Sequence, residues 1–161
     1  MSSPTVTSPE INGLIAAVSR NQQEGILGRF LEPHRWYALE PYLRPRLLSR
    51  GYLLISQGMS DRKVYFIESG SLKVDIQTES GFTELALLGP GAVAGEGSFF
   101  SRQPRIASVT AFTECKVWEL STDDFDALSR EHPSVALALS MALGAILATR
   151  MLDMSKRIAI T

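Results

Sequence analysis

The feature of this sequence that most limits its fold is a series of short runs in which apolar and polar residues alternate. The runs lie between Leu47 and Leu120, roughly ten residues apart, and their period of two is typical of half-buried β-strands. Turn residues such as Gly89-Pro90-Gly91 separate them. We therefore expect a β-roll (a double-stranded jelly roll), because the strand–helix alternation of a doubly wound fold is missing. The runs are Tyr52–Ser56, Lys63–Glu68, Ser71–Gln77, Phe82–Leu88, Ile106–Phe112 and Glu114–Leu120.

Helical periodicity flanks the predicted roll on both sides. Two helical pieces joined by a bend are expected between Ile11 and Phe30, with a start signal at Ser8-Pro9-Glu10 and a further short helix between residues 32 and 43. On the other side, Ser121-Thr-Asp-Asp is a strong start signal for a short helix. The fold class is thus mainly β with flanking α. The expected boundaries are a disordered tail over 1–10 and a single domain over 11–161, divided into N-terminal helices 11–43, β-roll 44–120 and C-terminal helices 121–161.

A long helix is expected from Pro133 onward. Its large apolar residues lie beside a stripe of small residues spaced four apart, which suits close packing on the roll or on the same helix of a second subunit. A homodimer through this helix is therefore one expectation. The uncharged stretch Pro133–Thr149 is short for a bilayer span, so direct membrane insertion is not expected. The large residues are Leu139, Leu143, Leu147, Met151, Met154 and Ile158, and the small ones are Ala136, Ser140, Gly144 and Ala148.

The stretch from Gly95 to Val109 carries groups that could bind an anion. Glu96 supplies a carboxylate directly after a glycine, where another backbone or a ligand can approach closely. Arg105 supplies a guanidinium nine residues later, and the small residues after it leave amides and the Ser108 hydroxyl within reach of the same anion. Together these groups predict a clamp for a phosphate and a sugar.

Charge and composition argue against several other functions. The net charge of −1 lacks the basic excess of nucleic-acid-binding proteins, so we expect no nucleic acid to bind this chain alone. A single cysteine, Cys115, excludes an intramolecular disulfide and favours a reducing, cytoplasmic location. Both histidines, His34 and His132, lie outside the predicted roll. A metal-dependent enzyme of the cupin type is therefore not expected, and neither catalytic residues nor a metal site are assigned.

Several ordered blocks of the sequence resemble the cyclic-nucleotide-binding domain family. That domain is shared by catabolite-activator-type transcription factors, protein kinase A regulatory subunits and cyclic-nucleotide-gated channels. The resemblance covers about residues 35 to 155 and includes both charged residues of the clamp. The matching blocks are Gly51–Gly58, Val64–Gly70, Leu88–Gly91, Gly95-Glu96, Pro104–Val109 and Val117–Leu120.

The resemblance implies a phosphate-binding cassette over residues 95–108. Glu96 would accept a hydrogen bond from the ribose 2′-hydroxyl, Arg105 would pair with the cyclic phosphate, and the C-terminal helix around Thr149–Met154 would cover the base. Two smaller residues, Val93 and Ala94, stand where the family often has aromatic ones. The expected ligand-binding residues, including those that contribute backbone amides, are Gly95, Glu96, Gly97, Ser98, Arg105, Ile106, Ala107 and Ser108.

The function implied by the resemblance is that of a non-catalytic cyclic-nucleotide sensor, which reports ligand occupancy through movement of its C-terminal helix. The resemblance favours cAMP over cGMP, because Ile106 occupies a position where cGMP-preferring members of the family carry threonine. No other cofactor is expected. Two alternatives remain. The chain could be a regulatory fragment of a catabolite-activator-type transcription factor, a channel or a transporter, or its pocket could be degenerate and hold another anionic ligand.

Overall fold

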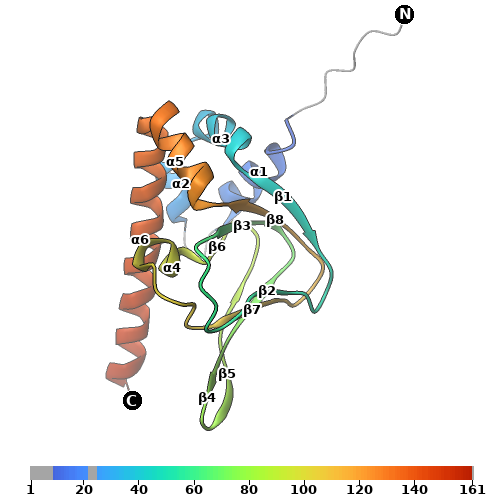
Figure 1. Cartoon of the computed structure of the whole chain (residues 1–161), viewed down its shortest axis with the longest axis vertical. Helices are drawn as coiled ribbons and strands as arrows, with labels where there is room; N and C mark the ends of the chain where they lie inside the picture. The colour runs from blue at the N-terminus through green and yellow to red at the C-terminus, as the bar shows by residue number, and fades with distance from the viewer. Residues whose placement is uncertain (1–8, 22–24, 161) are drawn as a thin grey trace, which may run out of the picture.

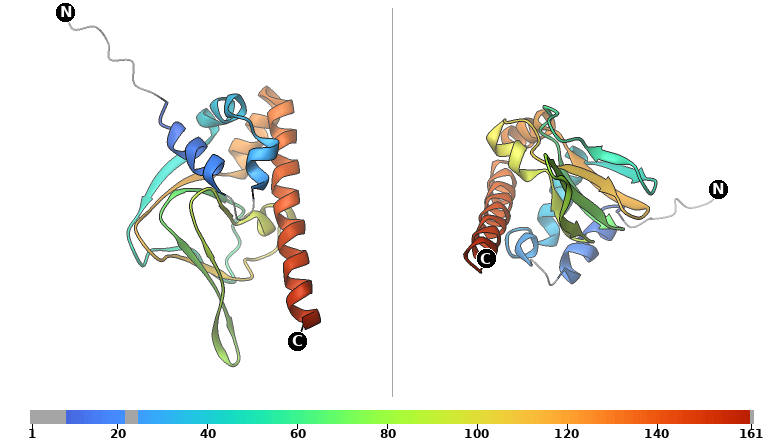
Figure 2. Two further views of the ribbon diagram at one scale, coloured as in Figure 1. Left: turned by 180° about the vertical axis from the view of Figure 1, so that it is seen from behind. Right: turned by 90° about the horizontal axis from the view of Figure 1, so that it is seen from below.

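The computed structural model describes residues 9–21 and 25–160, without the side chains of residues 154–160. The predicted tail therefore lies almost wholly outside the described residues, as does most of the polar gap after Asn21. Helices gather along one side of a β-roll, and the longest helix, α6, runs down the edge of the domain (Figures 1 and 2). The expected fold class, mainly β with flanking α, is confirmed.

The roll consists of two four-stranded antiparallel sheets. One sheet has the strand order β1-β8-β3-β6 and the other β2-β7-β4-β5. The β4–β5 hairpin projects away from the helices (Figure 1). The strands are β1 Arg44–Leu48, β2 Leu53–Ile55, β3 Val64–Ser69, β4 Leu72–Thr78, β5 Gly81–Leu88, β6 Val93–Ala94, β7 Ser108–Ala111 and β8 Cys115–Leu120.

Alternation along β3 explains how the roll has two cores. Tyr65 and Ile67 point between the sheets, where they join a cluster with residues of the second sheet such as Val109. Val64 and Phe66 point the other way and pack in a second cluster with the helices. Because successive side chains of a strand face opposite sides, a strand buried on both faces reads as a nearly continuous apolar run.

The helices that flank the roll occupy the regions that the sequence predicted, and one further short helix, α4, lies within the roll region. Ser121 caps α5, since its hydroxyl accepts the N–H of Asp124 at 3.1 Å, as the start signal indicated. The predicted cap, Ser8, lies outside the described residues; α1 begins at Asn12, three residues after Pro9, and its cap residue Ile11 makes no side-chain capping hydrogen bond. The helices are α1 Asn12–Arg20, α2 Ile26–Phe30, α3 Pro33–Leu39, the 3-10 turn η1 Glu40–Tyr42, α4 Glu96–Ser101, α5 Thr122–Glu131 and α6 Pro133–Ile160.

Two strands, β1 and β6, were not predicted. β1 contains Pro45, which has no N–H to donate, but β1 is an edge strand, so this loss is tolerated. β6 has only two residues, Val93 and Ala94, which pair with Phe66 and Tyr65 and are fully buried. Val93 packs in the helix-side cluster and Ala94 in the cluster between the sheets, so larger aromatic side chains at these positions would enlarge both cores.

The long helix α6 packs on α2 and α5 with one face. Leu139 and Leu143 are fully buried in the helix-side core, whereas Met151 is exposed. The small-residue stripe is not one continuous face, because Ala136 is buried and Ala148 is exposed. Among the described residues, α6 is also the one helix that length and composition would allow to cross a membrane, over Pro133–Asp153, and 39% of its most apolar 18-residue window is buried within the domain.

Candidate functional site

The clamp is built around the turn that joins β6 to α4. Gly95 forms this turn with a φ of 91°, in the left-handed region that favours glycine. A Cβ atom here would lie 2.6 Å from the carbonyl oxygen of Lys63 and 3.0 Å from Nη1 of Arg105. Glycine is therefore required both by backbone conformation and by the close approach of Arg105. The next residue, Glu96, begins α4 and is only 7% exposed.

Arg105 is buried, with 5% of its surface exposed, and is held entirely by the roll. Its Nε and Nη2 donate to the two carboxylate oxygens of Asp61, at 3.1 and 2.5 Å. Nη2 also donates to the Lys63 carbonyl oxygen at 2.6 Å, and Nη1 to that of Gly95 at 2.8 Å. These contacts use four of the five donor hydrogens of a guanidinium. One N–H of Nη1 is left for a ligand.

Asp61 is a residue of the site that was not predicted. Burial opposes ionisation of its carboxyl, but the hydrogen bonds and charge of Arg105 outweigh this and hold the pKa of Asp61 below its usual value. The backbone N–H of Lys63 adds a further hydrogen bond at 3.3 Å. Asp61 therefore fixes the orientation of the Arg105 guanidinium and neutralises part of its charge.

Glu96 is held from the opposite direction, by the C-terminal helix. Nη1 of Arg150, in α6, donates to Oε1 of Glu96 at 2.6 Å, and Nη2 donates to the carbonyl oxygen of Val93 at 2.8 Å. The Arg150 side chain is one-quarter exposed. The ion pair thus joins the start of α4 to a helix more than fifty residues further along the chain. Arg150 lies within the segment expected to cover a base, although it was not singled out beforehand.

The loop after Arg105 supplies unused backbone donors. The N–H groups of Ile106 and Ala107 donate to no acceptor in the part of the chain that the structure describes. The hydroxyl of Ser108 accepts the N–H of Gln57 at 2.9 Å, so it ties β7 to the segment after β2. The Ile106 side chain is 75% exposed, whereas Ala107 is buried.

At the start of α4, the amides of Gly97 and Ser98 fall in the first turn, where a helix has no internal acceptor for them. Phe99 is buried against Phe125, as expected of a packing residue, and Phe100 is partly exposed. Tyr65, Cys115 and Trp118 are likewise buried and pack in the core.

The structure therefore brings most of the predicted residues to one place. Gly95, Glu96 and Arg105 meet at the turn, and the free amides of Ile106 and Ala107 follow directly after Arg105 in the chain. A carboxylate acceptor, a guanidinium and free backbone donors form a set suited to a phosphate ester that carries a hydroxyl group. Asp61 and Arg150 complete the set, and the four charged side chains sum to zero.

The chain is similar in sequence to known proteins. A family model for the cyclic nucleotide-binding domain matches residues 45–132. The chain is 28% identical over 114 residues to the CRP-like cAMP-activated global transcriptional regulator of Mycobacterium tuberculosis, over 70% of this chain and 51% of that protein. It is 35% identical over 104 residues to the cyclic AMP receptor protein of Thermus thermophilus, over 63% of this chain and 48% of that protein. The chain spans about half the length of these curated relatives.

A solved structure agrees with the fold. The crystal structure of a cyclic nucleotide-binding domain from Methylobacillus flagellatus aligns with a TM-score of 0.80 at 21% identity, over 92% of this chain and 84% of that one. The segment matched by the family model is more than half of the chain and runs from β1 to the end of α5. It contains Asp61, Glu96 and Arg105. The chain therefore belongs to the cyclic nucleotide-binding domain family.

Proposed function

We propose that this domain binds a cyclic mononucleotide, cAMP in preference to cGMP, and reports its presence through α6 without catalysing a reaction. The observation that carries the proposal is the buried carboxylate of Glu96, the expected acceptor of the ribose, which is joined to α6 by Arg150. A cytoplasmic location, and the lack of nucleic-acid binding and membrane insertion by this chain, belong to the same proposal.

The phosphate half of the proposed site rests on Arg105 and the loop after it. A cyclic phosphodiester has one negative charge and two free oxygens. The unused Nη1–H of Arg105 and the free amides of Ile106 and Ala107 supply donors for those oxygens. Asp61 holds the guanidinium in place before the ligand arrives, which reduces the entropy lost on binding.

The ribose half rests on Glu96. Its Oε1 accepts from Arg150, and its second oxygen remains for the 2′-hydroxyl of a ribose. A bound ribose therefore shares its acceptor with α6. Since the surroundings of Arg150 differ between the empty and occupied site, binding shifts the position or mobility of α6.

A ligand panel tests this function. We expect thermal stability to rise most with cAMP, less with cGMP, and least with 5′-AMP or ATP, because a selective ligand stabilises the folded state through linkage. By calorimetry, 2′-deoxy-cAMP should bind about 10- to 100-fold more weakly than cAMP, the range for one hydrogen bond to a charged group. No stabilisation by any cyclic nucleotide would contradict the proposal and favour a degenerate pocket for another anion.

We also propose that α6 pairs with the same helix of a second copy of the chain. Its outward side carries exposed Leu137, Met141 and Met151, with Gly144 and Ala148 between them, at the alternating spacing of four and three typical of a coiled-coil seam. Analytical ultracentrifugation should show a dimer, and Met141→Lys should convert it to a monomer while Arg130→Ala, an exposed change on α5, should not. A monomeric parent chain would contradict this part of the proposal.

A further inference from the structure

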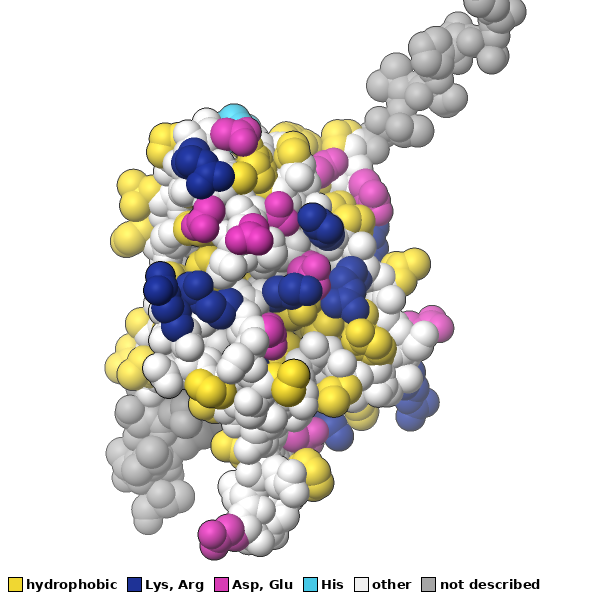
Figure 3. All heavy atoms as spheres, viewed as in Figure 1, with side chains coloured by type: hydrophobic (Ala, Val, Ile, Leu, Met, Phe, Trp, Pro, Cys, Tyr) yellow, Lys and Arg dark blue, Asp and Glu magenta, His cyan; other side chains and the backbone are white. Residues whose placement is uncertain are grey.

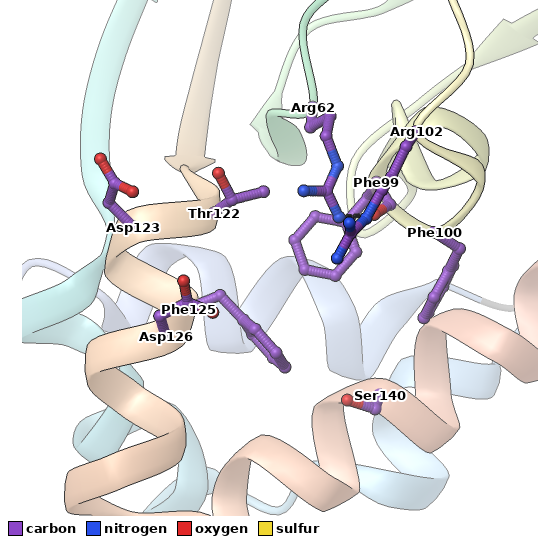
Figure 4. A pocket seen from close by; sticks show the side chains of 9 residues that line it. All are labelled: Arg62, Phe99, Phe100, Arg102, Thr122, Asp123, Phe125, Asp126 and Ser140. Carbon is purple, nitrogen blue, oxygen red and sulfur yellow. Dashed lines mark hydrogen bonds between the residues drawn. The ribbon is translucent and has the colours of Figure 1, made fainter.

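A cavity lies at the other end of α4 from Glu96. It has a volume of about 490 Å³, within the range of small-molecule sites, and is enclosed by the loop before β3, the end of α4, the start of α5 and α6 (Figure 4). Neither Glu96 nor Arg105 lines it. We propose that this cavity binds a small aromatic anion that also carries an amino group. The inference goes beyond the proposed function and does not rest on it.

Charges of both signs line the cavity without pairing. Arg62 and Arg102 stand on the side of the loop and α4, and Asp123 and Asp126 stand on α5. Within the described part of the chain, none of these four side chains belongs to an ion pair. On this face of the domain, lysine and arginine side chains form a band with acidic side chains above it (Figure 3). A cavity that has unpaired arginines on one side and unpaired aspartates on the other suits a ligand with an anionic group at one end and a hydrogen-bond donor at the other.

Arg62 is only partly satisfied by the protein. Its Nη2 donates to the carbonyl oxygen of Phe99 at 2.7 Å, while its Nε is buried and has no partner among the described residues. Buried donors without acceptors are rare in folded proteins, and they often mark a place where an ion or ligand is expected. Together with Arg102, Arg62 offers the paired guanidinium groups that favour a carboxylate or a phosphate.

Aromatic rings supply the apolar part of the cavity. Phe99 and Phe125 meet edge to face, with ring centroids 5.2 Å apart, and the guanidinium carbon of Arg62 lies 5.9 Å from the Phe99 centroid. Figure 4 shows Phe125 reaching from α5 toward the space that Arg62 and Arg102 also enter. An aromatic body between these groups would place its anionic end at the arginines. An amino group at the opposite end could donate to Asp126.

The backbone at Arg102 strengthens the assignment. Arg102 ends α4 with a φ of 61°, and it is the one non-glycine residue with a positive φ among those described. Glycine or asparagine is the usual choice at such a helix end, because a Cβ atom is strained there. Arg102 therefore adopts a strained backbone conformation although its cationic side chain has no protein partner in the described structure.

Calorimetry and NMR on the full chain test the proposal with three probes. We expect saturable binding of 4-aminophenyl phosphate, several-fold weaker binding of phenyl phosphate, which lacks the amine, and at least tenfold weaker binding of aniline, which lacks the anion. Amide signals of residues 99–102 and 122–126 should shift, while those of 105–108 should not.

Arg102→Gly separates a role in binding from a role in folding. Glycine adopts the observed backbone without strain, so thermal stability should be unchanged or higher, while affinity for 4-aminophenyl phosphate should fall at least tenfold. Asp126→Asn should remove the advantage of the amino group over phenyl phosphate, and Arg130→Ala should change neither. The proposal is overturned by an absence of saturable binding, by unchanged affinity in Arg102→Gly, or by shifts at residues 105–108 instead. Binding of cAMP at the clamp is followed separately, through the amide signals of residues 105–108.

Discussion

The two charged residues of the clamp both adjoin Gly95, Glu96 as its neighbour in the chain and Arg105 through a hydrogen bond to its carbonyl oxygen, yet they are anchored in different parts of the molecule. Arg105 is held by Asp61 and by the carbonyl oxygens of Lys63 and Gly95, all of which belong to the roll or its loops. Glu96 is held by Arg150 of α6. The arginine half is therefore complete as soon as the roll has folded. The glutamate half is complete only when α6 is docked.

Because of this difference, the two halves should contribute separately to ligand affinity and to the response of α6 to the ligand. A group fixed within the roll contributes to ligand binding and to folding stability, but it has no direct contact through which to move a distant helix. Glu96 can move α6, because the ligand and Arg150 of α6 both bind its carboxylate. We expect changes in the arginine half to alter affinity and stability, and changes in the glutamate half to alter selectivity for the ribose and the behaviour of α6.

The largest effect is expected from Arg105→Ala. Removing the guanidinium should weaken cAMP binding by about 2 to 5 kcal/mol, or about 30- to 5000-fold, the scale for truncating one partner of a buried charge pair. Folding stability should also fall, because Asp61 and two carbonyl oxygens lose their donor. Calorimetry with cAMP measures the affinity. Arg105→Lys keeps the charge without the guanidinium fork, so its affinity for cAMP should lie between those of the parent chain and Arg105→Ala. Unchanged affinity in Arg105→Ala would refute the assignment.

The next effect concerns stability and its dependence on pH. Asp61→Asn should lower the free energy of unfolding by about 1.5 to 3 kcal/mol near neutral pH, because Arg105 loses charge-assisted hydrogen bonds. The folded-state pKa of Asp61 lies below its unfolded value of about 4. The contribution of the pair is thus complete above that value and is lost as the pH falls through the folded-state pKa.

Thermal or urea unfolding between pH 7 and pH 3 measures this dependence. The stability difference between the parent chain and Asp61→Asn should be constant near neutral pH and shrink in acid. Glu79→Gln, which changes an exposed carboxyl in the β4–β5 turn, serves as the matched control and should show no such difference at either end. A difference that persists undiminished at pH 3 would mean that Asp61 acts through its shape rather than its charge.

The same contrast explains what could be predicted from the sequence. Alternation and turn residues predicted the roll, and the Gly-Glu pair and Arg105 predicted the clamp, because these signals are local. Strand β1 was missed because Pro45 stands between two arginines and resembles a loop. Asp61 and Arg150 were missed because their partners lie 44 and 54 residues away in the sequence. The sequence around a single charged residue in a loop or helix contains no pattern that predicts such a distant contact.

The smallest effect, and the one that most directly tests the glutamate half, is expected from Arg150→Gln. Thermal stability should fall moderately, because the Arg150 side chain is only one-quarter exposed and its loss leaves the buried Glu96 carboxylate and the Val93 carbonyl oxygen without this donor. The preference for cAMP over 2′-deoxy-cAMP should shrink by about 1 to 2 kcal/mol, or about 5- to 30-fold, an intermediate value between exposed and buried ion pairs. Without its counter-charge, the Glu96 carboxylate is less firmly positioned as an acceptor for the ribose hydroxyl.

Hydrogen exchange of α6 provides the second measurement for Arg150→Gln. In the parent chain, cAMP should change the exchange of amides around residues 147–153, and in Arg150→Gln this response should be lost while the response of residues 105–108 is kept. Arg130→Ala is the control, since it removes an exposed arginine from α5 without touching the clamp. If α6 responds to cAMP equally in both variants, the signal reaches the helix by another route, and the contact between Arg150 and Glu96 is only part of the packing of α6 on α4.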